Sequence, residues 1–163
     1  VGIINYLKRQ SRKNDFFITA SSQVNGHEPK NALLFNDHNK YFLSQNSTNS
    51  FIHIDFQMHL VNPTGYEIRT ISNSSSGNFY PKSWRIEGSN NNSDWVLLDQ
   101  QSNCSILNGP NKVGKFNINN SNNKEFRFIR LIQVGPNFNN DNTLGIDSFE
   151  IYGILNQHLD RFS

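Results

Sequence analysis

The chain has 163 residues, a formal net charge of +2 at pH 7, 17% charged residues and 13 phenylalanines. This length suits one domain with a single sizeable core, and so small a charge without a concentrated basic stripe argues against a nucleic-acid partner. The one basic run, residues 8–13 (KRQSRK), is interpreted as a solvated segment. No apolar run is long enough to cross a bilayer, so a membrane partner is not expected.

Helical spacing occurs only at residues 2–9, where Ile3 and Leu7 lie four apart, and it predicts one or two turns. An apolar patch at 31–35 is interpreted as a helical turn, and residues 66–71 form a strand after a turn that contains Pro63. The predicted strands cover residues 16–19, 51–56, 66–71, 83–88, 95–99, 112–118, 126–134 and 148–153.

About eight short strands with no helices between them predict an all-β fold, a single antiparallel jelly-roll β-sandwich with a short N-terminal helical turn. We expect residues 1–14 to be an extension packed on the domain, 15–154 to be the sandwich and 155–163 to be a tail. Because the first residue is not methionine, we expect a monomeric domain of a longer protein.

Residues 81–100 (PKSWRIEGSNNNSDWVLLDQ) form the clearest predicted hairpin, and each strand carries one of the two tryptophans. Trp84 shares a face with Ile86, as period-2 alternation requires of a half-buried strand. Asn and Ser fill the turn because their side chains bond to local backbone and tolerate left-handed geometry. We expect both Trp84 and Trp95 to belong to the core.

Catalytic patterns are poor in this sequence. Cys104 is the only cysteine and lies in a polar segment, so it is interpreted as incidental. His53 and Asp55 share the outer face of one strand, and a structural surface pair is the favoured interpretation because no third partner accompanies them. The protein is therefore not expected to be an enzyme. A single cysteine excludes an intrachain disulfide and favours a cytoplasmic location, with a secreted or cell-surface location as the alternative.

The order of several segments resembles that of discoidin domains, the coagulation-factor type C or galactose-binding-like family, across nearly the whole chain. The resemblance rests on FFITASS, PKNAL, FIHIDF, SWRIEGS, FRFIRL and LGIDSFEIYG, which begin at residues 16, 29, 51, 83, 126 and 144. GIINYL, EGSNNNSDW and SILNGPNKVGKFNI look closest to the intracellular eukaryotic subset found with BTB or ubiquitin-ligase adaptor proteins.

The resemblance implies that a ligand meets loops at one end of the sandwich, here residues 23–28, 36–41, 72–80 and 137–142. Tyr41, Phe79 or Phe138 could offer an aromatic plate to a sugar, with polar partners beside it. The full set of predicted ligand-binding residues is Val24, His27, Asn36, Asp37, His38, Tyr41, Arg69, Asn78, Phe79, Phe138 and Asn139.

We expect a non-catalytic binding module that recruits a protein or peptide partner through these loops. A carbohydrate-binding, lectin-like module is the alternative, and a structural domain with no ligand of its own is the second alternative.

Many bacterial carbohydrate-binding relatives carry a structural calcium in the second of these loops, closed by an acidic residue on the last strand. Asn36, Asp37, Asn39 and Glu150 could supply oxygens, the ligand type that calcium prefers. Lys40 in the same loop counts against such a site. A structural calcium is the only cofactor that the resemblance suggests.

Overall fold

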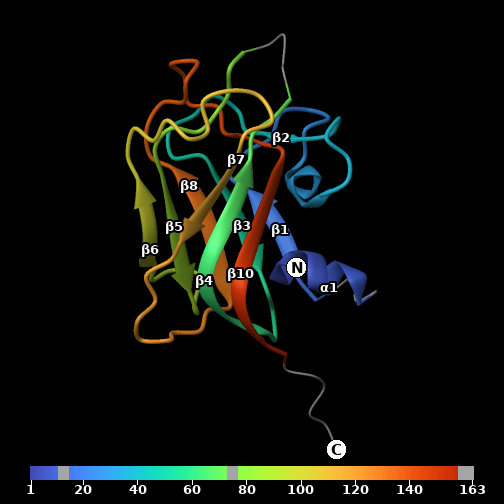
Figure 1. The fold of residues 1–163 in the computed structure, drawn as a ribbon, viewed down its shortest axis with the longest axis vertical. Helices are drawn as coiled ribbons and strands as arrows, with labels where there is room; N and C mark the ends of the chain where they lie inside the picture. Colours follow the sequence, from blue (N-terminus) through green and yellow to red (C-terminus); the bar gives the residue numbers. More distant parts are fainter. Residues whose placement is uncertain (11–14, 73–76, 158–163) are drawn as a thin grey trace, which may run out of the picture.

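A computed structural model describes residues 1–10, 15–72 and 77–157 (Figure 1). Of the predicted extension and tail, residues 11–14 and 158–163 lie outside the described residues. The elements in chain order are α1 (Ile3–Arg9), β1 (Phe17–Ala20), the 3-10 helix η1 (Pro29–Leu33), β2 (Phe42–Leu43), β3 (Phe51–Asp55), β4 (Leu60–Arg69), β5 (Trp84–Ser89), β6 (Val96–Gln101), β7 (Val113–Asn117), β8 (Phe128–Gln133), β9 (Gly145–Ile146) and β10 (Ser148–Asn156). No helix among the described residues is long and apolar enough to cross a membrane.

Antiparallel pairing arranges the strands in a five-stranded sheet (β1-β3-β8-β5-β6), a three-stranded sheet (β10-β4-β7) and the small pair β2-β9. In Figure 1 the three-stranded sheet lies in front of the five-stranded one. The predicted all-β sandwich is confirmed. The two strands that the sequence did not predict, β2 and β9, have two residues each, too short for a periodic pattern to be read.

The core lies between the two larger sheets. Ile52 and Ile54 of β3 are fully buried, whereas the residues between them are only partly buried, as the alternation predicts. Trp84 is fully buried, and its ring meets the edge of Phe116 from the opposite sheet at a centroid distance of 5.4 Å. The prediction that Trp84 belongs to the core is confirmed.

A chain of hydrogen bonds crosses this core. The Trp84 indole N–H donates to the Tyr66 hydroxyl at 2.9 Å, and that hydroxyl donates to Asp99 Oδ2 at 2.5 Å. Burial, and then the neighbouring Asp99 carboxylate, raise the pKa of Tyr66 well above its ordinary value. The two polar groups of the largest core side chains are thus satisfied inside the sandwich.

Strand β4 begins earlier than the sequence predicted. It runs through Pro63, which pairs with Gly153 beside a register shift that leaves Thr64 of β4 without a partner in β10, so the expected turn at Pro63 is wrong. A proline has no N–H for the ladder and is tolerated where a bulge interrupts the pairing. Gly153 has φ +147°, and a Cβ there would overlap the carbonyl oxygen of Asn62. Beyond this bulge β10 continues to Asn156.

Trp95 does not belong to the core, and that prediction is wrong. It lies half-buried on the outer face of the five-stranded sheet, where the Arg130 guanidinium sits 3.9 Å from the centroid of its ring. His53 approaches the same ring edge-on at 5.8 Å. Since β6 begins only at Val96, the alternation of that strand does not determine the side that Trp95 takes.

Helix α1 packs against β10 through Ile3, Ile4 and Leu7. The side chain of Glu150, on β10, accepts hydrogen bonds from the backbone N–H of Ile4 and of Asn5, both at 2.9 Å. These N–H groups lie in the first helical turn, where no carbonyl of the helix can reach them. The Glu150 carboxylate therefore acts as the N-terminal cap of α1.

Candidate functional site

The predicted ligand loops lie at one end of the sandwich, drawn at the top of Figure 1. The turn of the tryptophan hairpin lies at the opposite end of the same view. Residues 73–76 of the third loop lie outside the described residues. The arrangement of the loops follows from the strand directions, because β1, β4 and β8 all run toward this end.

Tyr41 and His27 form the best-defined aromatic unit of this end. Their rings stack with centroids 4.5 Å apart at an interplanar angle of 23°, and both side chains are half-buried. His27 Nδ1 lies 3.2 Å from the Tyr41 carbonyl oxygen, which also accepts a bond from the buried Asn31 amide. The turn from Val24 to His27 is tied to Leu43 by backbone bonds of 2.8 and 3.2 Å. The stacked pair is therefore fixed from both of its loops.

A small apolar cluster lies beneath these loops, separate from the main core. Leu43, Ile71, Phe79 and Tyr80 are buried in it, and Val24, Tyr41 and Phe138 pack against it partly exposed. Phe79 is only 8% exposed, so its predicted use as an exposed sugar plate is wrong. Burial of the large apolar ring of a phenylalanine stabilises the fold more than its exposure to solvent in a loop.

The third and fourth loops are joined by amide side chains. Asn139 Oδ1 accepts the backbone N–H of Asn78 at 3.2 Å, and its amide nitrogen donates to Asp141 at 2.7 Å. Asn137 is fully buried and donates to Asp141 and to the Thr143 carbonyl, both at 2.7 Å. The sequence prediction missed Asn137 and Asp141, because their role depends on a loop conformation and no periodic pattern marks it.

Lys82 is a further residue that the sequence did not single out. Its ammonium lies 5.4 Å from the centroid of the Phe138 ring, within the range of a cation–π contact. The loop end thus combines partly exposed rings, side-chain amides and a cation. Such a set can stack on the apolar face of a small polar ligand and bond to its hydroxyl groups.

His38 and Arg69, two further residues of the predicted set, contact the buried carboxylate of Asp147. His38 Nδ1 lies 2.8 Å from Asp147 Oδ2, and Arg69 Nε lies 3.6 Å from the same oxygen. Burial raises the pKa of Asp147, and His38 and Arg69 only partly offset it. His38 and Arg69 line a hollow of about 260 Å³ together with Glu150. The structure therefore divides the predicted ligand-binding set into two groups.

The four residues proposed for calcium do not form a ready site. The two carboxylate oxygens of Glu150 accept N–H groups of Ile4, Asn5 and Ile151, and Asp37 Oδ1 accepts the Asn39 N–H at 3.1 Å. Calcium takes six to eight oxygens. Within the described ranges no group of three or more His, Cys, Asp or Glu residues is placed to hold a metal ion. Asn36 is exposed. The calcium expectation stays a prediction without support from this geometry.

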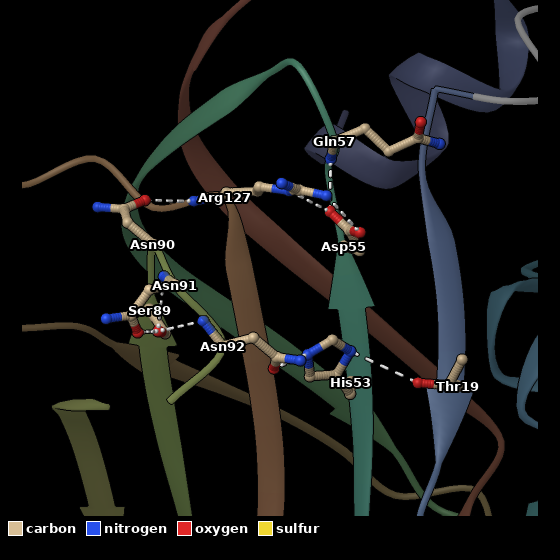
Figure 2. A network of polar contacts seen from close by, with 9 residues as sticks. All are labelled: Thr19, His53, Asp55, Gln57, Ser89, Asn90, Asn91, Asn92 and Arg127. Atoms are coloured by element: carbon tan, nitrogen blue, oxygen red, sulfur yellow. Dashed lines mark hydrogen bonds and ion pairs between the residues drawn. The ribbon is translucent and has the colours of Figure 1, made fainter. Parts of the chain in front are cut away.

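His53 and Asp55 have separate partners on the outer face of the five-stranded sheet (Figure 2). His53 lies 2.9 Å from Asn92 Oδ1 and 3.5 Å from the Thr19 hydroxyl. Asp55 accepts the Gln57 backbone N–H at 2.7 Å and two bonds from Arg127, at 2.9 and 3.1 Å. Burial opposes ionisation of Asp55, but these bonds outweigh it and lower its pKa. These contacts support the interpretation of His53 and Asp55 as structural residues.

Solved structures similar to this chain include three carbohydrate-binding modules from Clostridium perfringens. CBM32-3 of a family 31 glycoside hydrolase superposes with a TM-score of 0.68 at 14% identity, covering 88% of this chain and 98% of that one. CpGH89CBM32-5, solved in complex with GalNAc-β-1,3-galactose, gives 0.67 at 10% identity, covering 86% and 97%. The family 32 module of NanJ, solved in complex with galactose, gives 0.64 at 10% identity, covering 85% and 94%.

At these identities the likeness establishes the fold. No curated protein sequence matches the chain. The family model described as F5/8 type C domain matches residues 17–146, from the start of β1 to the end of β9. The chain therefore belongs to the F5/8 type C domain family, as its resemblance to discoidin domains predicted.

Proposed function

We propose that this domain is a non-catalytic carbohydrate-binding module and that its loop end is the binding site. The observation that carries the proposal is the half-buried Tyr41 ring, held by stacking on His27 next to loops joined through Asn78 and Asn139. Sugar sites combine an aromatic ring for C–H faces with a few fixed polar groups. The prearranged ring pair lowers the cost of ordering these side chains when a ligand binds.

His27 also supplies a polar group to this site. Its Nδ1 is engaged with the Tyr41 carbonyl oxygen, and in the described structure Nε2 has no hydrogen-bond partner. That nitrogen can therefore bond to a sugar hydroxyl as donor or acceptor, depending on the tautomer. Lys82 adds a cation over the ring of Phe138, which packs against the apolar cluster.

The similar structures favour a glycan over a protein ligand. Two of them were solved in complex with GalNAc-β-1,3-galactose and with galactose, and the CBM32 of AlyQ was solved in complex with 4,5-unsaturated mannuronic acid. Recruitment of a protein or peptide, the first expectation from the sequence, has no specific contact in its favour. The cytoplasmic location and the link to the adaptor-associated subset stay predictions.

Calorimetric titration with galactose and with GalNAc-β-1,3-galactose tests the proposal. Tyr41→Ala should weaken binding about fivefold to tenfold, the loss expected for one aromatic contact, while Tyr41→Phe keeps the ring and most of the affinity. Tyr6→Ala is the matched control, because Tyr6 is 38% exposed on α1, away from the loops. Absence of binding to either sugar and to a broad glycan array, or equal affinity of the Tyr41→Ala variant, would contradict the proposal.

A further inference from the structure

A larger pocket lies on the flank of the sandwich, between α1, β1 and η1. It has a volume of about 660 Å³, against about 260 Å³ for the hollow beside His38. Its apolar lining comes from residues in and next to β1 and η1, namely Phe16, Phe17, Ile18, Leu33 and Leu34. Phe17 is 52% exposed, although it is a large apolar residue. A pocket of this size with mainly apolar walls is typical of small-molecule sites.

The charged residues that line this pocket are all cations. Lys8, Lys30 and Lys40 line it, and no aspartate or glutamate is among the described residues that do so. Lys8 is held in place: its ammonium donates to the Leu33 carbonyl and lies 5.3 Å from the Phe35 ring centroid. Lys30 pairs with Glu28 at 3.1 Å, but its side chain stays 74% exposed. Because such an exposed ion pair is weak, replacing Glu28 by an anionic ligand group costs little free energy.

Apolar walls with a wholly cationic rim match one class of small molecule. We propose that this pocket binds a single-chain amphiphile with an anionic head group, its aliphatic chain against Phe17 and Leu34 and its head beside Lys30 and Lys40. Lysine ammonium groups bind a carboxylate or sulfate as mobile point charges, with their methylene stems along the apolar wall. Apart from Lys40, the residues that line this pocket lie outside the ligand loops, and the proposal does not depend on the proposed sugar binding.

Head-group preference tests the charge argument. Decanoate, decanol and decyltrimethylammonium, each below its micellar concentration, are titrated into the wild-type domain by calorimetry. Decanoate should bind most tightly, and octanoate should bind about fifteenfold more weakly than decanoate, because it lacks two methylenes and each buried methylene contributes about fourfold. Equal affinity for the three head groups, or no dependence on chain length, would overturn the proposal.

A charge-reversed variant makes the test specific to this pocket. Lys30→Glu/Lys40→Glu should reverse the order of decanoate and decyltrimethylammonium, and a matching melting curve shows that the variant is folded. Lys115→Glu is the control, because Lys115 is 72% exposed on β7 and is not among the pocket residues. Galactose titration of the single variant Lys30→Glu separates this site from the loop end, because Lys30 lies outside the ligand loops whereas Lys40 lies in one of them. Lys30→Glu should weaken decanoate binding and keep any sugar affinity. An unchanged order of head groups in the folded double variant would overturn the proposal.

Discussion

Replacing Tyr66 by phenylalanine should destabilise the domain through the hydrogen bonds of its hydroxyl. The change leaves the fully buried indole N–H of Trp84 without an acceptor and removes a donor from Asp99. An unsatisfied buried donor costs about 1–3 kcal/mol, and a hydrogen bond to a charged group contributes about 1.5–3 kcal/mol. Because Asp99 is partly exposed and can bond to water instead, we expect a total loss of about 2–4 kcal/mol.

Urea denaturation followed by far-ultraviolet circular dichroism measures this loss. In a thermal melt followed by the same signal, the Tm of a domain of this length should fall by about 5–15 °C. Tyr152→Phe is the matched control, since Tyr152 is half-buried on β10 and its hydroxyl bonds to no residue in the described structure; its effect should stay within about 0.5 kcal/mol. If Tyr66→Phe is no more destabilising than Tyr152→Phe, the reasoning about the buried polar chain is refuted.

Three further predictions concern β10 and two carboxylates. Gly153→Ala should cost about 2–4 kcal/mol in urea denaturation, because φ is +147° and the new Cβ overlaps backbone; a loss below about 1 kcal/mol would contradict this. Glu150→Ala should remove hydrogen-exchange protection from α1 while the sheets keep theirs, and retained protection would show that the carboxylate does not hold the helix. Burial raises the pKa of Asp147, so the stability due to its carboxyl is fully present below the unfolded pKa and is lost as pH rises through the folded pKa. Asp147→Asn should therefore cost most below about pH 4 and less near pH 7. Asp55→Asn should show the opposite trend, because burial raises the pKa of Asp55 but the bonds from Arg127 and Gln57 together with the nearby positive charge outweigh it and lower that pKa. Parallel pH profiles for the two variants would contradict both assignments.

The strands that bury one face could be predicted from the sequence, because apolar and polar residues alternate along them. The alternation of Ile52 and Ile54 and the position of Trp84 were read correctly for this reason. The side of the sheet that Trp95 takes could not be predicted in this way, because Trp95 lies one residue before β6. Its ring packs against Arg130 on the outer face instead. Sequence reasoning therefore works inside the strands and fails at their ends.

The candidate site could be predicted only in part. The family resemblance indicated which loops meet at one end, and Tyr41 does lie there with His27. It could not show that Phe79 is buried or that His38 turns to Asp147, because both depend on packing between segments far apart in the sequence. The amphiphile pocket was not expected from the sequence at all, since Lys30 and Lys40 become neighbours of β1 only through tertiary packing.

The bond from Ile4 to Glu150 has a consequence for the order of folding during synthesis. It joins residues 146 positions apart, and α1 has only seven residues, too few to be a stable helix alone. Because α1 leaves the ribosome before β10, its N–H groups have no acceptor until that strand has been made. Contacts of such long range are slow to form. We expect α1 to dock last, as the step that completes a sandwich already assembled from β1 to β10.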